Sequence, residues 1–232
     1  MTPPGPPMPS DPPPTIGEQY RATRERLTDL LAGAAEADWA RPVPACPGWD
    51  VHDVVAHLVA VVDDALAGRL TGPPSPQVTA GQVARLREEA GAVMLARWAE
   101  QAPLFEQAVT DLGIWPPAFD VGAHEQDVRG ALGRPGARDC ALVRTAARLL
   151  IEEFAGDATI VADLDDDVAR SHPGTGGEHH LRTTPFEVFR FRLGRRSRQQ
   201  VAELDWTPVP DDALLDSLFI FGPATAALVE EA

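Results

Sequence analysis

The chain has 232 residues, of which 44% are hydrophobic, and this is typical of a globular protein with a sizeable core. Its formal net charge of -15 makes nucleic acid and anionic membranes poor partners. No apolar run approaches the roughly 20 residues of a transmembrane helix. The N-terminus also lacks the basic and apolar regions of a secretory signal. These observations predict a cytoplasmic protein, and they leave its oligomeric state open.

Two cysteines, Cys46 and Cys140, lie far apart in the sequence, and neither belongs to a CxxC pair. Disulfide frameworks and cysteine-rich zinc sites need more cysteines at closer spacing. We therefore predict that both are reduced, ordinary thiols.

The N-terminal part changes from a proline-rich tail to a helical pattern. Residues 1–14 are dominated by proline, which favours extended and solvated chain, so we predict that this tail is disordered. Residues 16–31 have a pattern compatible with a helix. Residues 39–48 contain three prolines, which predict a loop.

The clearest helix of the sequence follows Asp50. Asp50 has the side chain of an N-cap residue, and Asp53 completes a capping-box-like pattern three residues later. Apolar residues then recur at helical spacing up to Leu66, and Gly68 is a natural end. His57 lies in the middle of this helix, outside its main apolar stripe.

Two more helices follow a proline- and glycine-rich break. Residues 78–112 form one long helical pattern, which Pro103 is expected to kink or split. Residues 117–132 form the next helix, which Gly133 ends. Four helices with one long crossover predict a four-helix bundle over residues 15–137.

The remainder, residues 138–232, has a different character, and we predict a smaller C-terminal domain that is α/β or mostly helical. The predicted elements are a helix over 141–155, a strand over 158–164, a glycine-rich loop over 165–178, a helix or strand over 185–193, and a helix over 211–230 that is interrupted near 222. The fold class is therefore mainly α.

Asp120 and His124 have the spacing of two ligands on one helix face, at adjacent turns. HExxH helices present two histidines to zinc in this way. A helix-stabilising Asp–His pair is the competing interpretation. His57 alone is more simply a structural histidine, and the spacing does not show that it lies opposite the other two.

If the three residues meet, they supply two imidazoles and one carboxylate, which leaves an open coordination position typical of catalytic zinc. Zinc at such a site lowers the pKa of bound water and deprotonates a coordinating thiol. The same ligand set occurs in non-haem iron oxygenases, but no β-rich pattern surrounds these residues. The set favours zinc and leaves other divalent metals open.

Three motifs occur in order along the chain: CPGWDVHDVVAHL from Cys46 to Leu58, FDVGAHEQDVRGALGRPG from Phe119 to Gly136, and PFEVFRFRLGRRSRQQVAELDW from Pro185 to Trp206. Together they resemble the mycothiol-dependent maleylpyruvate isomerase-like family, which belongs to the wider DinB-like group of metal-binding four-helix bundles. The resemblance extends from about Ile16 to Trp206.

The resemblance implies a zinc ion held by His57, Asp120 and His124. Some members have glutamate where this chain has Asp120, and a shorter carboxylate can still ligate. Asp127, one turn after His124, has the position of an acceptor that orients a ligand imidazole. An exposed partner for an arginine is the alternative role of Asp127.

The resemblance also implies a catalytic C-terminal arginine, for which Arg195 and Arg196 are the candidates because guanidinium groups suit carboxylates. Five arginines lie between Arg190 and Arg198, so a solvated basic face is the alternative. His179 and His180 are adjacent and point in different directions, which favours a surface loop over a metal site.

The family resemblance predicts a zinc-dependent enzyme that uses mycothiol as a thiol cofactor or co-substrate on an electrophilic small molecule. The outcome is either isomerisation or thiol S-transfer. The alternatives are a metal-dependent hydrolase that uses zinc hydroxide and a non-catalytic binding or regulatory bundle.

Overall fold

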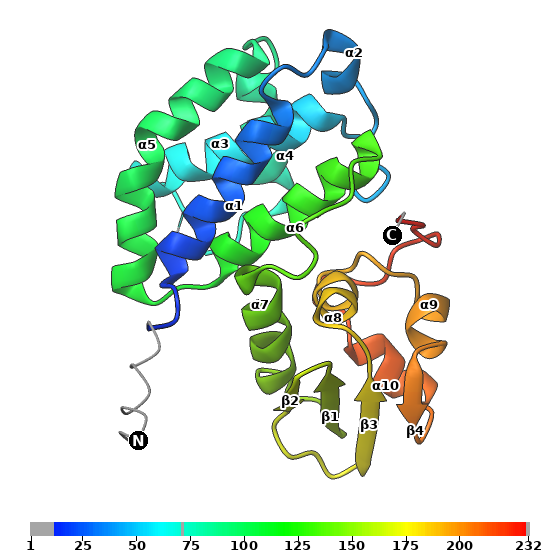
Figure 1. Ribbon diagram of the computed structural model, residues 1–232. Helices are drawn as coiled ribbons and strands as arrows, with labels where there is room; N and C mark the ends of the chain where they lie inside the picture. Colours follow the sequence, from blue (N-terminus) through cyan, green and yellow to red (C-terminus); the bar gives the residue numbers. More distant parts are fainter. Residues whose placement is uncertain (1–11, 71, 231–232) are drawn as a thin grey trace, which may run out of the picture.

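The computed structural model describes residues 12–70 and 72–230 (Figure 1). The predicted disordered tail, residues 1–14, lies outside the described residues as far as residue 11. The described chain is mainly helical, with a small sheet near the C-terminus, which confirms the predicted fold class. None of the described helices is both long and apolar enough to cross a membrane.

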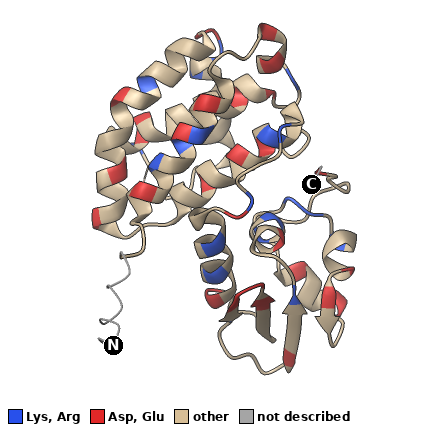
Figure 2. Cartoon of the chain, viewed as in Figure 1, with Lys and Arg blue, Asp and Glu red and all other residues tan. Residues whose placement is uncertain are grey.

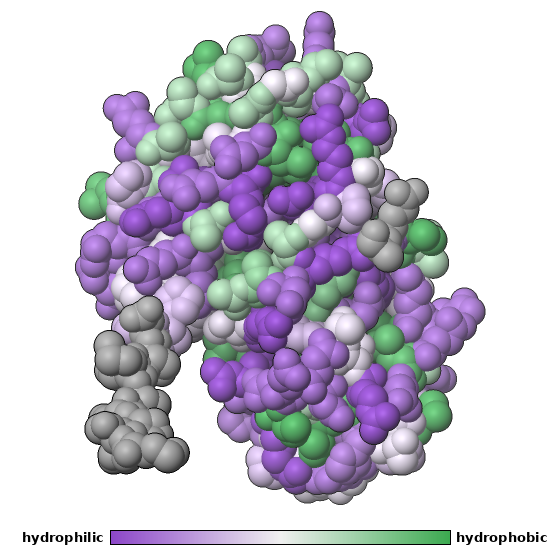
Figure 3. All heavy atoms as spheres, in the orientation of Figure 1, coloured by the Kyte–Doolittle hydropathy of each residue, from purple (hydrophilic) through white to green (hydrophobic). Residues whose placement is uncertain are grey.

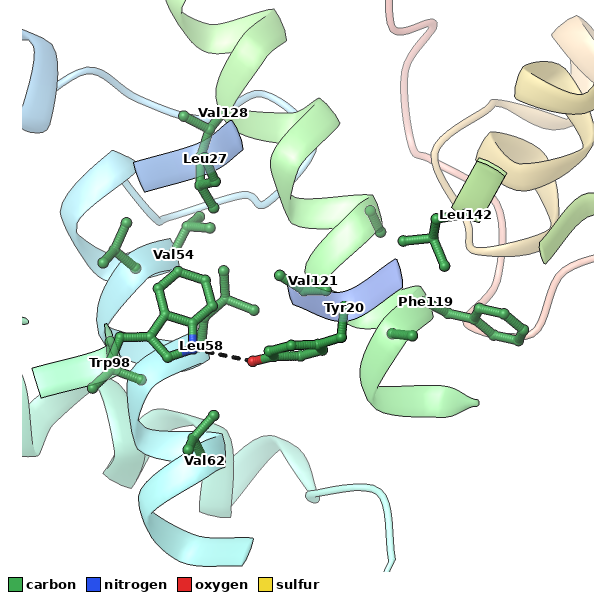
Figure 4. Close-up of a cluster of buried hydrophobic side chains, with 14 of the residues drawn as sticks. Tyr20, Leu27, Val54, Leu58, Val62, Trp98, Phe119, Val121, Val128 and Leu142 are labelled. Carbon is green, nitrogen blue, oxygen red and sulfur yellow. Dashed lines mark hydrogen bonds between the residues drawn. The ribbon is translucent and has the colours of Figure 1, made fainter. Parts of the chain in front are cut away.

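Four long helices pack around one core in the N-terminal part. They are α1 (Ile16–Leu31), α3 (Val51–Leu66), α5 (Gly91–Leu112) and α6 (Pro116–Leu132). Both α1 and α3 contact α5 and α6, which closes the four helices around a shared interior (Figure 1). Figure 4 shows this interior, where the indole Nε1 of Trp98 donates a hydrogen bond to the hydroxyl of Tyr20 at 3.1 Å.

The predicted start of α3 is confirmed in detail. Asp50 caps the helix by accepting a hydrogen bond from the backbone N–H of Asp53 at 2.9 Å, and the Asp53 side chain reaches back to complete a capping box. Most apolar residues of α3 are buried in the core, and so is His57. His57 is buried although it lies outside the main apolar stripe of α3, because α4 (Pro76–Leu86), α5 and α6 all pack against this helix.

The predicted helix over residues 78–112 is wrong, because two helices occupy this region. Helix α4 (Pro76–Leu86) ends before residues 87–90, and α5 begins at Gly91 and continues through Pro103. Gly91 lies against the ring of Trp39, where a Cβ would come within 2.5 Å of a ring carbon. The short helix α2 (Glu36–Trp39) therefore packs against the start of α5, next to the break between α4 and α5. The prediction considered only Pro103 as a place where the helix could break, and the break lies elsewhere.

The C-terminal part combines short helices with a four-stranded sheet. The helices are α7 (Ala141–Glu152), α8 (Pro185–Arg192), α9 (Arg198–Ala202) and α10 (Asp212–Ser217). The strands are β1 (Thr159–Leu164), β2 (Asp167–Arg170), β3 (Glu178–Arg182) and β4 (Asp205–Thr207). The sheet order is β2-β1-β3-β4, with β1 and β3 parallel and the two outer pairs antiparallel.

Several C-terminal predictions need correction. The segment 185–193, which the pattern left as helix or strand, is helix α8. The predicted loop over 165–178 contains β2, and the predicted helix over 211–230 is helical only in α10. Strand β2 has four residues, and only one of them is buried. It therefore lacks the alternation of apolar and polar residues that predicts a strand.

Two hydrophobic clusters divide the interior, and α7 and α8 contribute to both. Leu150 and Phe189 belong to the cluster of the long helices, whereas Ile151 and Phe191 belong to the cluster against the sheet. In Figure 1, α7 and α8 lie between the long helices and the sheet. The domain boundary at residues 137 and 138 stays a prediction.

The surface reflects the composition. Figure 2 shows acidic residues spread over both parts of the molecule and interspersed with basic ones. On the face shown in Figure 3, hydrophobic side chains are scattered between hydrophilic ones. The strongly negative net charge is therefore not gathered into one patch on the face in view.

Candidate metal centre

The packing of α6 against α3 brings His57, Asp120 and His124 together. The Nε2 atom of His57 lies 3.4 Å from one oxygen of Asp120, and the Nε2 atom of His124 lies 3.5 Å from the other. One ligand atom from each residue lies within 4.8 Å of the other two. Both imidazoles are buried, whereas the Asp120 side chain is 36% exposed, so the group opens to solvent on the carboxylate side.

The two imidazoles are held from behind by different acceptors. His57 Nδ1 lies 3.2 Å from Oε1 of Gln82, and His124 Nδ1 lies 3.1 Å from Oδ2 of Asp127. An ionised carboxylate only accepts hydrogen bonds, so His124 Nδ1 carries the proton in this contact. The Nε2 atoms of both imidazoles face the Asp120 carboxylate, so Nε2 is the nitrogen of each ring that could ligate a metal there, with Nδ1 held by a protein acceptor.

Asp127 is the centre of a buried ion-pair network. One of its oxygens lies 2.8 Å from Nη2 of Arg190, and the other lies 3.0 Å from Nη2 of Arg195. Burial raises the pKa of the Asp127 carboxyl, but the charges of Arg195 and Arg190 outweigh burial and hold that pKa well below its ordinary range. Asp127 is therefore ionised and is not the exposed partner of the alternative interpretation.

The loop before α3 contributes two side chains to this group. The Cys46 thiol donates a hydrogen bond to Asp127 at 3.4 Å, and burial, with the nearby negative charge of Asp127, raises the pKa of this thiol. The ring of Trp49 lies 5.4 Å from the ring of His57 and 6.2 Å from that of His124, measured between centroids. Cys46 is thus a free thiol, as predicted, but its position beside the candidate site was not anticipated.

Asp120 is charged at neutral pH. Burial raises the pKa of its carboxyl, but the positive charge of His124 and the hydrogen bond from His57 outweigh burial and lower the pKa to about 2. The group therefore offers one anionic oxygen donor and two nitrogen donors. This donor set is one that zinc takes in proteins.

The two candidate arginines have different surroundings. Arg195 contacts Asp127, and its charge lies close enough to Asp120 to influence the pKa of that carboxyl. The guanidinium of Arg196 instead pairs with Glu187 at 2.7 Å and with Glu230 at 2.9 Å. Of the two, only Arg195 is shown in contact with the metal-ligand neighbourhood.

Other titratable groups lie elsewhere. His179 and His180 were predicted in a loop but belong to strand β3, where they contact the Pro208 carbonyl and Glu178.

Among the described residues, two more groups have metal-ligand spacing. One consists of Asp50, His52 and Asp53 at the start of α3, and the other consists of Cys46, His124 and Asp127. In the second group Asp127 already pairs with two arginines, whose charges oppose a cation.

Sequence reasoning missed Trp49, Gln82 and Arg190. Trp49 lies inside the first motif and Arg190 inside the third. The motifs therefore marked both positions as candidates, but they did not indicate what either side chain does. Gln82 lies outside all three motifs, in a helix that was predicted as continuous with α5, and no signal in the sequence singles it out.

The family model of the mycothiol maleylpyruvate isomerase N-terminal domain matches residues 20–142, which is more than half of the chain. No curated protein matches the chain. Two solved structures resemble it, a mycothiol-dependent maleylpyruvate isomerase and a mutant of a protein with the same title. Each is 13% identical, with a TM-score of 0.53, over 85% of this chain and 94% of the other. These structures share the fold, and the chain belongs to the family of the mycothiol maleylpyruvate isomerase N-terminal domain.

Proposed function

We propose that the chain is a zinc-dependent enzyme that uses mycothiol on an electrophilic small molecule, either to isomerise it or to transfer the thiol to it. The observation that carries the proposal is the convergence of two imidazole Nε2 atoms on the Asp120 carboxylate. The residues present fit zinc, because three protein ligands leave one position open for a thiol. The family membership supports mycothiol as that thiol.

Zinc at this site would supply a charge that lowers the pKa of a bound thiol, and mycothiol would supply the sulfur. The chain's own residues prepare the site for both. Asp127 and Gln82 hold the imidazoles, and the ring of Trp49 lies against both of them. The Asp120 side is the exposed one, so thiol and substrate would enter there.

The test of this function uses the wild-type protein, purified without a polyhistidine tag. We expect close to one zinc per chain by elemental analysis. We also expect turnover of maleylpyruvate or chlorodinitrobenzene only with mycothiol present, lost on chelation and restored by zinc. The first probe reports isomerisation and the second S-transfer. A protein that cannot be loaded with any divalent metal would overturn the proposal.

The same experiment separates the alternatives. Turnover that persists without any thiol would favour a metal-dependent hydrolase. Iron in place of zinc would redirect the search toward oxygen chemistry. The cytoplasmic location stays a prediction that belongs to this proposal, since mycothiol is a small cytosolic thiol.

A contrast between the two candidate arginines tests the substrate side of the site. Arg195→Met is expected to lower kcat/KM about 100-fold, because the variant removes a fixed positive charge beside the reacting group. Arg196→Met removes a charge that Glu187 and Glu230 already neutralise, so we expect kcat/KM to change little while stability falls. Steady-state kinetics and urea unfolding of both variants measure this contrast. Equal losses of kcat/KM would contradict the role of Arg195.

A further inference from the structure

Gln82 bridges two side chains of α3 from the neighbouring helix α4. It is fully buried, with an exposed fraction of 0%. Its amide Nε2 donates to Oδ2 of Asp64 at 2.9 Å, and its Oε1 lies 3.2 Å from Nδ1 of His57. His57 and Asp64 lie about two turns apart on the same face of α3, so one side chain from α4 reaches both.

The chemistry of Asp64 fixes which way the Gln82 amide points. The Asp64 side chain lies 2.7 Å from Arg69 and 2.7 Å from Arg85, and these charges keep it ionised. An ionised carboxylate accepts hydrogen bonds and donates none, so the NH₂ group of Gln82 must face Asp64. The carbonyl oxygen of Gln82 must then face His57. The orientation of the amide follows from this chemistry and not only from an assignment of its atoms.

We propose that Gln82 is a positioning residue of the metal centre, because it holds His57 in the tautomer that carries its proton on Nδ1. This inference rests on the proposed function. Nε2 is then the nitrogen of His57 that is left to bind a metal, and it points into the space shared with Asp120 and His124 Nε2. Asp64, Arg69 and Arg85 act through Gln82 and do not touch the imidazole.

The two imidazoles therefore have unlike partners. His124 is held by a carboxylate, which increases the basicity of a ligand imidazole, whereas His57 is held by a neutral amide. Gln82 fixes the orientation and tautomer of His57 without adding charge to the site. The packing of α4 against α3 is what brings the Gln82 amide to His57.

The test compares Gln82→Met, which keeps the volume and removes the amide, with Gln19→Met. Gln19 is also buried, but it lies in α1, and its amide donates to the Pro14 carbonyl and not to a histidine. In competition with a chromophoric chelator, zinc affinity should fall about 10–100-fold for Gln82→Met. It should stay within about twofold for Gln19→Met, because the hydrogen bond that Gln19 makes goes to Pro14 and not to a candidate ligand.

A second measurement is made first on the wild type. Nitrogen NMR of the zinc-loaded protein should show His57 bound through Nε2 with its proton on Nδ1, and this preference should weaken in Gln82→Met. A wild-type His57 that binds zinc through Nδ1 overturns the inference even if the variant fails to fold. Wild-type zinc affinity in Gln82→Met, with zinc binding lost in His57→Ala, overturns this inference alone. A wild type that binds no zinc overturns both it and the proposed function.

Discussion

His57→Ala is expected to abolish stoichiometric zinc binding, which is the largest effect that the structure predicts. The substitution removes one of three donors, and the remaining Asp120 and His124 lie on a single helix. Two ligands leave two further positions to water, and such a site competes poorly with a chelator. Elemental analysis after dialysis against a weak chelator measures the effect, and His124→Ala should behave in the same way.

The matched control is His52→Ala, at the start of the same helix. His52 is half-buried and its Nε2 lies 2.7 Å from the Glu89 carbonyl oxygen, so the control also removes a histidine contact. It also tests the group of Asp50, His52 and Asp53 as a metal site. We expect His52→Ala to keep wild-type zinc content. Loss of zinc in this control, with retention in His57→Ala, would place the metal at the start of α3 instead.

The helices that carry the candidate ligands were predictable because their determinants are local. Asp50 caps α3 through its own side chain, and Gly133 ends α6 in the left-handed conformation that glycine adopts readily. The i, i+4 spacing of Asp120 and His124 then fixes their common face. The meeting of this face with His57 is a tertiary contact. Family motifs, not periodicity, indicated it.

The rest of the site depends on contacts between distant segments, which periodicity does not encode. Gln82 reaches His57 only because α4 folds back onto α3. Arg190 has the pattern of a helical surface residue, yet it is 1% exposed and pairs with Asp127 across the interface of α6 and α8. Because arginine is rarely buried, a prediction from sequence alone places such a residue on the surface.

Asp127→Ala is expected to destabilise the metal-free protein by about 3–5 kcal/mol, the cost of removing one partner of a buried ion pair. The Asp127 side chain is fully buried, and the substitution leaves Arg190 and Arg195 without their shared carboxylate. It also removes the acceptor for His124 Nδ1, so zinc affinity should fall about 10–100-fold. Urea unfolding and chelator competition measure the two effects.

Asp139→Ala is the control, because its side chain is 73% exposed in its ion pair with Arg144. An exposed pair contributes about 0–1 kcal/mol, so this variant should unfold close to the wild type. Asp127→Asn separates charge from hydrogen bonding, since the amide oxygen can still accept from His124 Nδ1. We expect Asp127→Asn to lose most of the stability that the Asp127 ion pairs contribute, but to retain more zinc affinity than Asp127→Ala. Wild-type stability in both Asp127 variants would contradict the network.

The stability that Asp127 contributes should also depend on pH. The folded-state pKa of Asp127 is lowered, so its contribution is fully present above the unfolded pKa of about 3.9 and is lost as the pH falls toward the folded value. In that acidic range the wild-type carboxyl becomes neutral, as the amide of Asp127→Asn always is. The difference in unfolding free energy between these two proteins should therefore be constant near neutral pH and shrink below about pH 4. A difference that does not change with pH would mean that the arginines do not depress the Asp127 pKa.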